Sequence, residues 1–137
     1  MKEHQVTVKD RLIAQLRAAL GPYYEQSDPS VYVAMYADRA TSFDPWSKGR
    51  KDDAAVAENL MSLTGTIPHL GYDLVRPRVD LVGDAAVFTF ELDAKDLRTG
   101  ETVGLWNATQ VHDLATEDAK LVHAHWSYAV PPAEDAG

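Results

Sequence analysis

The chain has 137 residues, of which 45% are hydrophobic, enough for one domain with a buried core. Its formal net charge of −8 at pH 7 argues against nucleic acid and anionic membrane surfaces as partners, because both require concentrated Lys and Arg. The chain contains no cysteine, which excludes disulfides and thiolate chemistry.

The first half of the chain predicts three helices. Residues 6–20 carry apolar side chains at helical spacing, and Gly21-Pro22 predicts the end of that helix. Residues 27–38 predict a second helix, and residues 51–65 a third. Between these two helices, residues 39–50 read as a short strand that runs into a loop.

After Gly65 the periodicity changes to that of strands. Four segments rich in Val, Leu, Phe, Trp, Thr and Tyr are separated by turn signals: 72–83, 85–96, 102–114 and 120–130. Helices followed by successive strands favour an α+β fold with an antiparallel sheet. Pro77 is expected at an edge or a bulge of its strand, because proline cannot donate to the ladder.

The domain organisation is predicted to be simple. Residues 1–130 are expected to form one domain, and residues 131–137 an acidic, proline-containing disordered tail. The polar start of the chain shows no secretory signal, and no apolar run reaches the ~20 residues of a membrane helix. We therefore expect a cytoplasmic protein.

The segment LVHAHWSY (residues 121–128) could belong to a metal site, a catalytic base or an ordinary sheet. In a strand, His123 and His125 share one face, and Trp126 points to the other. A metal site also needs a third protein ligand, and this strand carries no carboxylate on the histidine face. The favoured interpretation is that both rings make cross-strand or subunit contacts. No metal and no cofactor is predicted.

Alternation divides the central strands into two sets, but it does not say which set faces the helices. Phe88, Phe90 and Leu92 share one face of their strand, and Thr89 and Glu91 lie on the other. The side chains of the next strand, 102–114, also fall into two sets. Alternation alone leaves open which set faces the helices.

Four short segments carry a family resemblance. They are TSFDPWSKG (41–49), ENL (58–60), RPRVDLVGDAA (76–86) and LVHAHWS (121–127), in that order along the chain. Together with the order of helices and strands, they resemble the nuclear transport factor 2-like superfamily, which includes ketosteroid isomerases and SnoaL-type polyketide cyclases. Within it, the chain is most similar to the association domain of calcium/calmodulin-dependent protein kinase II, from about Tyr32 to Pro131.

The resemblance implies a cone-shaped fold in which three helices pack into a curved antiparallel sheet with a pocket on its concave side. The arginines that line the association-domain pocket fall at Glu91, Gln110 and Trp126, so a carboxylate ligand is not expected. The family's pocket tyrosine matches Tyr32. The full implied concave set, with its neighbouring helix positions, is Tyr32, Asp53, Met61, Thr89, Glu91, Trp106, Ala108, Gln110 and Trp126.

The same resemblance implies a convex face that packs against a second subunit. Asn107, Thr109, His123 and His125 are placed there by the resemblance. With these histidines, Phe88, Phe90, Leu105 and Val111 would form a partly apolar surface, which predicts a homodimer.

Three functions follow, in order of preference. The first is a small-molecule-binding pocket for a small, mostly apolar ligand, with Trp46 either closing its mouth or packing on the third helix. The second is a proton-transfer isomerase or cyclase, with Glu91 and Asp53 as candidate catalytic carboxylates and Tyr32 stabilising an oxyanion. The third is an oligomerisation module. Asp44, which precedes Pro45, is interpreted as part of an Asx-type turn.

Overall fold

The computed structural model describes residues 2–130, so the predicted tail at 131–137 lies outside the described residues. The helices are α1 (Lys2–Glu25), α2 (Ser30–Ala34) and α3 (Ala54–Met61). The strands are β1 (Tyr36–Phe43), β2 (Lys51–Asp52), β3 (Gly71–Val82), β4 (Ala85–Lys95), β5 (Thr102–Asp113) and β6 (Lys120–Val130). The α+β class and the order of helices before the long strands are as predicted.

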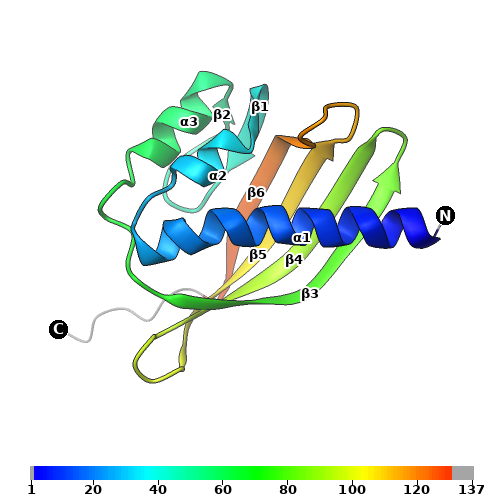
Figure 1. Cartoon of the computed structure of the whole chain (residues 1–137). Coiled ribbons are helices and arrows are strands. Elements are labelled where there is room, and N and C mark those ends of the chain that lie inside the picture. Colours follow the sequence, from blue (N-terminus) through cyan, green and yellow to red (C-terminus); the bar gives the residue numbers. More distant parts are fainter. Residues whose placement is uncertain (1, 131–137) are drawn as a thin grey trace.

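The six strands form one curved sheet in the order β2-β1-β6-β5-β4-β3 (Figure 1). Strands β3 to β6 pair antiparallel as a meander, whereas β1 pairs with β6 in parallel. The sheet is therefore mixed, and the expectation of a purely antiparallel sheet is wrong at this pair. A parallel pair needs a long connection, which the chain between β1 and β6 provides. The sequence did not predict this pair, because the alternation of residues within a strand does not show whether the neighbouring strand runs parallel or antiparallel.

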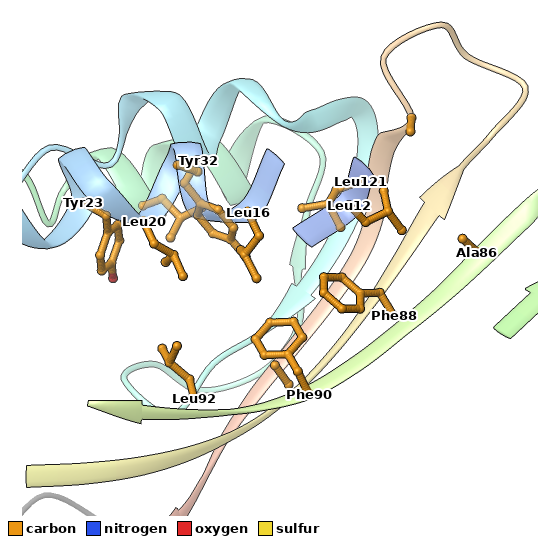
Figure 2. Packing of buried hydrophobic residues seen from close by; sticks show 14 of the residues in the cluster. Leu12, Leu16, Leu20, Tyr23, Tyr32, Ala86, Phe88, Phe90, Leu92 and Leu121 are labelled. Atoms are coloured by element: carbon orange, nitrogen blue, oxygen red, sulfur yellow. The ribbon is translucent and has the colours of Figure 1, made fainter. Parts of the chain in front are cut away.

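Helix α1 lies across one face of the sheet and supplies one side of the core (Figure 1). Leu12 and Leu16 are fully buried, and they point toward Phe88 and Phe90 of β4 (Figure 2). Apolar side chains from a helix stripe and from one sheet face thus meet in a single layer, which is how both elements bury their hydrophobic surfaces.

Helix α1 does not end at Gly21-Pro22 as predicted but continues to Glu25. The added turn buries Tyr23 and Tyr24, and the Tyr24 ring lies 5.8 Å from that of Tyr72. An internal proline costs about 3 kcal/mol, whereas burying two tyrosine rings contributes on the order of 10 kcal/mol. Tertiary packing therefore overrides the local stop signal.

Helix α2 is shorter than predicted, because the chain turns into β1 at Tyr36. Tyr36 is in register with Leu121 of β6, and the Leu121 N–H donates to the Met35 carbonyl at 2.8 Å. Residues assigned to a helix from the spacing of their apolar side chains are instead recruited by a strand that is distant in sequence. Helix α3 is also shorter than its predicted range, 51–65.

Strand β3 contains Pro77 at the edge of the sheet, as predicted. Its register with β4 shifts between Val75 and Arg78, and Arg76 has a φ of 51°. An unpaired residue in the left-handed region is the signature of a bulge. The missing N–H of Pro77 thus falls where the ladder is already interrupted.

Strand β4 faces the opposite way from the implied arrangement. Phe88 and Phe90 are 0% and 4% exposed and lie in the core, not on a convex interface (Figure 2). Phe88 pairs with Gln110 and Phe90 with Ala108, so these four side chains share the concave face. Thr89 and Glu91, which were expected in the concavity, therefore lie on the convex face.

Candidate functional site

A narrow cavity opens between the helices and the concave face of the sheet. Its walls come from the end of α1, from α2 and α3, from β1 and the loop after it, and from β5 and β6. Its volume of about 40 Å³ is room for about three water molecules. The lining residues are Leu20, Tyr23, Tyr24, Tyr32, Tyr36, Ser42, Phe43, Asp44, Trp46, Asn59, Leu60, Trp106 and Trp126.

An open groove of about 650 Å³ adjoins this cavity. Tyr23, Tyr24, Trp46 and Trp106 line both spaces. The rest of the groove is mostly apolar and comes from the segment after α3 and from the far ends of β4, β5 and β6: Leu63, Thr66, Ile67, Pro68, Leu70, Ala94, Val103, Gly104 and Tyr128. The site thus has a small inner chamber and a larger apolar approach.

Tyr32 is the centre of a buried hydrogen-bond network. Its hydroxyl accepts from Gln110 Nε2 at 3.2 Å and from Trp126 Nε1 at 2.9 Å, and it lies 3.0 Å from the Tyr36 hydroxyl. Because two N–H donors occupy both lone pairs of the Tyr32 oxygen, its proton is donated to Tyr36. Tyr36 itself lines the cavity.

Both phenols stay protonated over the physiological pH range. Burial raises the pKa of Tyr32, against the opposing effect of its hydrogen bonds. Burial, followed by the proximity of Tyr32, raises the pKa of Tyr36 well above its usual value. The inner wall of the cavity therefore presents a neutral O–H donor.

Asp44 brings a carboxylate to the same cavity. Its Oδ1 accepts from the Trp46 N–H at 2.9 Å and from the Ser47 N–H at 3.1 Å, which is the predicted Asx-type turn. Its Oδ2 accepts from Asn59 Nδ2 of α3 at 2.9 Å. These bonds fix the carboxylate in place, and all of these donors are neutral.

Aromatic rings form the remaining wall. Trp106 lies at the centre, with ring centroids 5.3 Å from Trp46, 5.9 Å from Trp126 and 4.4 Å from Tyr128. Trp126 also meets Phe90 edge to face at 5.5 Å. Trp46, which is 45% exposed, stands where the cavity meets the groove.

Five of the residues predicted for the site are brought together. Tyr32, Trp46, Trp106 and Trp126 line the cavity, and Gln110 supports it from behind through Tyr32. The position of Trp46 against Trp106 is that of a residue at the mouth, one of its two expected placements.

Four other candidates are placed elsewhere. Glu91 forms an ion pair with Arg76 at 2.8 Å, and Thr89 lies beside them on the convex face. Asp53 is exposed just before α3, where its Oδ1 accepts from the Ala40 N–H. Met61 is 42% exposed. The geometry therefore does not support Glu91 or Asp53 as pocket carboxylates.

Sequence reasoning missed Tyr36, Asn59 and the cavity-lining position of Asp44. Tyr36 lies within residues 27–38, which the sequence predicts as a helix, and the position of Asp44 before Pro45 predicts only a turn. The signal that could have found Asp44 is chemical: SFDPW (42–46) places an acidic residue between two aromatic residues, a few positions after Tyr32 and Tyr36.

His123 and His125 lie on the convex face, opposite Trp126, as expected. His123 Nδ1 is 2.7 Å from Thr41 Oγ1, and the His125 ring lies 5.2 Å from that of Phe43. Partial burial, followed by the proximity of His125, lowers the pKa of His123. Among the described residues, no group of three His, Asp or Glu side chains is arranged to hold a metal ion.

His112 of β5 is a buried histidine whose facing the strand alternation left open. It is 0% exposed on the concave face of β5, and its Nδ1 lies 2.9 Å from the Ala119 carbonyl oxygen. That bond assigns the ring proton to Nδ1, since a carbonyl can only accept. Burial lowers the pKa of His112, so the folded protein holds a neutral ring.

The fold is shared with solved structures of low sequence identity. A Pseudomonas putida nuclear transport factor 2-like protein of unknown function is 18% identical, with a TM-score of 0.73 over 93% of this chain and 87% of that chain. The association domain of Caenorhabditis elegans calcium/calmodulin-dependent protein kinase II is 17% identical, with a TM-score of 0.72 over 91% and 98%.

A Parabacteroides distasonis protein with the provisional description of a ketosteroid isomerase is 24% identical, with a TM-score of 0.70 over 86% of this chain and 85% of that chain. No family model matches the sequence, and no curated protein matches it significantly. The chain therefore has the nuclear transport factor 2-like fold, which confirms the resemblance at that level. Within residues 2–130, no helix is both long and apolar enough to cross a membrane.

Proposed function

We propose that the protein binds a small organic molecule in the cavity and groove between α1, α3 and the concave sheet face. The observation that carries this proposal is the lining of the cavity, which combines tilted and edge-to-face aromatic rings with a few polar residues, namely Tyr36, Asp44 and Asn59. Ligand sites are typically concave, mostly apolar and equipped with a small number of orienting polar groups.

Intrinsic fluorescence offers a direct test. The chain has three tryptophans, and Trp46, Trp106 and Trp126 all line the cavity. A ligand that enters should change the emission saturably, and Trp126→Ala should weaken binding by about 3 kcal/mol through lost packing. Thr89→Ala, on the convex face, is the matched control and should bind as the wild type does. A library of small ring compounds that leaves the emission unchanged would contradict the proposal.

A second candidate function is proton transfer. Asp44 is the carboxylate that lines the cavity, and the Tyr36 hydroxyl lines it as well. A fixed carboxylate can take a proton from a carbon next to a carbonyl group, while a neutral phenol stabilises the developing oxyanion. Deuterium incorporation from D₂O into cyclic ketones, followed by NMR, would test this. Asp44→Asn should abolish the exchange, and exchange that persists in this variant would exclude the role.

We also propose that the protein forms a homodimer through the convex face. With Phe88 and Phe90 in the core, this face is built around Phe43, Thr109, Val111 and the two histidines of β6. Phe43 is 37% exposed, and its ring is tilted by 45° against that of His125. Aromatic residues are enriched at the centre of subunit contacts and polar groups at their rim, and on this face the Arg76–Glu91 ion pair lies on β3 and β4, away from Phe43.

A further inference from the structure

The charge distribution of the cavity is unbalanced. Asp44 is the carboxylate in its wall, and among the described residues that line the cavity and the groove, none is Lys, Arg or His. The hydrogen bonds to Asp44 come from two backbone N–H groups, the Ser47 hydroxyl and the Asn59 amide, all of which are neutral. The negative charge is thus oriented by hydrogen bonds, and among the described residues no positive side chain pairs with it.

The aromatic wall complements a positive charge in the same space. The faces of tryptophan and tyrosine rings attract cations within about 6 Å of the ring centroid, most strongly where water is excluded. Trp46, Trp106 and Trp126 form a continuous series of rings around the cavity, and Tyr36 lines its inner side. An anion in the cavity would be repelled by the carboxylate of Asp44, whereas a cation would be attracted by it.

The shapes of the two spaces divide the ligand into a head and a body. The inner cavity admits a group of only a few non-hydrogen atoms, whereas the groove is larger and lined by apolar residues such as Leu63, Ile67 and Val103. A compact charged head can occupy the chamber beside Asp44 while an apolar body lies in the groove past Trp46. The net charge of −8 also favours the approach of a cation.

We propose that the ligand of this site is an organic cation, an amine or quaternary ammonium compound with an apolar body. This proposal rests on the proposed binding function and adds the charge of the ligand. Asp44 supplies the counter-charge, and the tryptophan rings supply the cation–π surface. From the Tyr36 hydroxyl we expect a second feature in the ligand, an oxygen atom that accepts a hydrogen bond.

The test compares probes of nearly the same shape that differ in charge. Choline and 3,3-dimethylbutan-1-ol differ only in the charge of the branched head, whereas 3,3-dimethylbutanoate keeps the uncharged branched head and carries a carboxylate in place of the alcohol end. In fluorescence titrations of the wild-type protein, choline should bind about tenfold or more tighter than the alcohol, and the anion should bind most weakly. Hexyltrimethylammonium should bind tighter than choline, because its chain reaches the groove.

Two variants identify the source of the preference. Asp44→Asn should reduce the preference for choline over the alcohol to about threefold or less, because the turn acceptor is kept but the charge is lost. Trp46→Leu, at a half-exposed position, should weaken the binding of choline and leave the binding of the alcohol nearly unchanged. Thermal melting checks that each variant is folded. If a variant is unfolded, the comparison of choline with the alcohol in the wild-type protein still tests whether the ligand is a cation.

The outcomes separate the two proposals. Equal binding of choline and the alcohol to the wild-type protein would overturn the inference of a cation and leave the binding function standing. Tighter binding of 3,3-dimethylbutanoate would overturn it in the same way. Failure of every probe, hexyltrimethylammonium included, to change the fluorescence would overturn both.

Discussion

At the scale of single residues, the hydroxyl of Tyr32 has the largest structural role in the site. Its oxygen atom accepts hydrogen bonds from the Gln110 amide and the Trp126 N–H, and it also bonds to the Tyr36 hydroxyl. These groups come from β5, β6 and β1, so a single side chain on α2 fixes the inner wall against three strands. A buried network of this kind holds the rings in one arrangement, although Gln110 Oε1 is itself buried without a hydrogen-bond partner among the described residues.

Tyr32→Phe should therefore destabilise the protein although it removes only one atom. The Gln110 amide and the Trp126 N–H would lose their shared acceptor in a buried site, at a cost of about 1–3 kcal/mol. Urea denaturation at pH 7.5 would measure the change. Tyr36→Phe is the matched control, because it removes a hydroxyl at the cavity end of the network, and it should cost less. Equal losses in the two variants would contradict the assigned direction of the hydrogen bonds.

His112 predicts a dependence of stability on pH. Burial holds the pKa of the folded ring below its usual 6.5, and the nearby Arg11 charge acts in the same direction. The unfolded chain takes up a proton below pH 6.5 that the folded protein does not bind. The contribution of His112 to stability is thus complete above pH 6.5 and is lost as the pH falls, by up to about 1.4 kcal/mol per pH unit.

Denaturant midpoints between pH 7.5 and pH 5 would measure this slope. In His112→Gln the slope should be shallower, because the side-chain amide can still donate to the Ala119 carbonyl but does not titrate. His69→Gln, at an exposed position, is the matched control. A His112→Gln slope identical to that of the wild type would show that the burial of this ring does not govern the acid sensitivity.

At the scale of elements, β4 shows most clearly which side chains of the sheet point into the core and which point to the convex face. Phe88, Phe90 and Leu92 are buried at every second position, and the residues between them point outward. The same alternation continues across β5 through the pairing of Phe90 with Ala108. A shift of one residue in this register would exchange the core for the convex face.

Adjacent substitutions in β4 should therefore have very different effects. Phe90→Ala should lower the free energy of unfolding by about 3–5 kcal/mol, because it leaves a cavity beneath α1. Thr89→Ala, one residue earlier, should change it by no more than about 0.5 kcal/mol. Chemical denaturation of both variants under one condition makes the comparison. A large loss for Thr89→Ala with a small one for Phe90→Ala would reverse the assigned faces.

At the scale of the whole molecule, one sheet separates two surfaces with different proposed uses. The concave side holds the core and the aromatic cavity, whereas the convex side carries Thr109, Val111 and the two histidines. Because alternate residues of β5 and β6 serve the two sides, ligand binding and self-association can be altered independently by substitutions one residue apart.

The proposed homodimer predicts a mass twice that of the 15.1 kDa chain at micromolar concentration. Thr109→Arg, at the middle of the convex face, should give the monomer mass, because it would bury an unpaired charge in the contact. Light scattering measures both masses, and the fluorescence response of the cavity checks that the variant is folded. A wild-type mass of one chain would contradict the dimer.

The sequence by itself determined the elements whose signals are local. Hydrophobic periodicity predicted the α+β class and all four long strands, and Pro77 predicted the bulge of β3. It also predicted that His123 and His125 lie opposite Trp126, because alternation within one strand is a property of the backbone. Five residues of the site followed from these strands together with the family resemblance.

Only the tertiary structure decided how separate segments meet. The facing of β4, the parallel pairing of β1 with β6 and the continuation of α1 past Pro22 each depend on contacts between residues distant in sequence. The placement of Asp44 inside an aromatic cavity depends on them as well. At such positions the free energy of burial between elements exceeds local propensity by several kcal/mol. The sequence of a single strand or turn does not predict which other element it packs against.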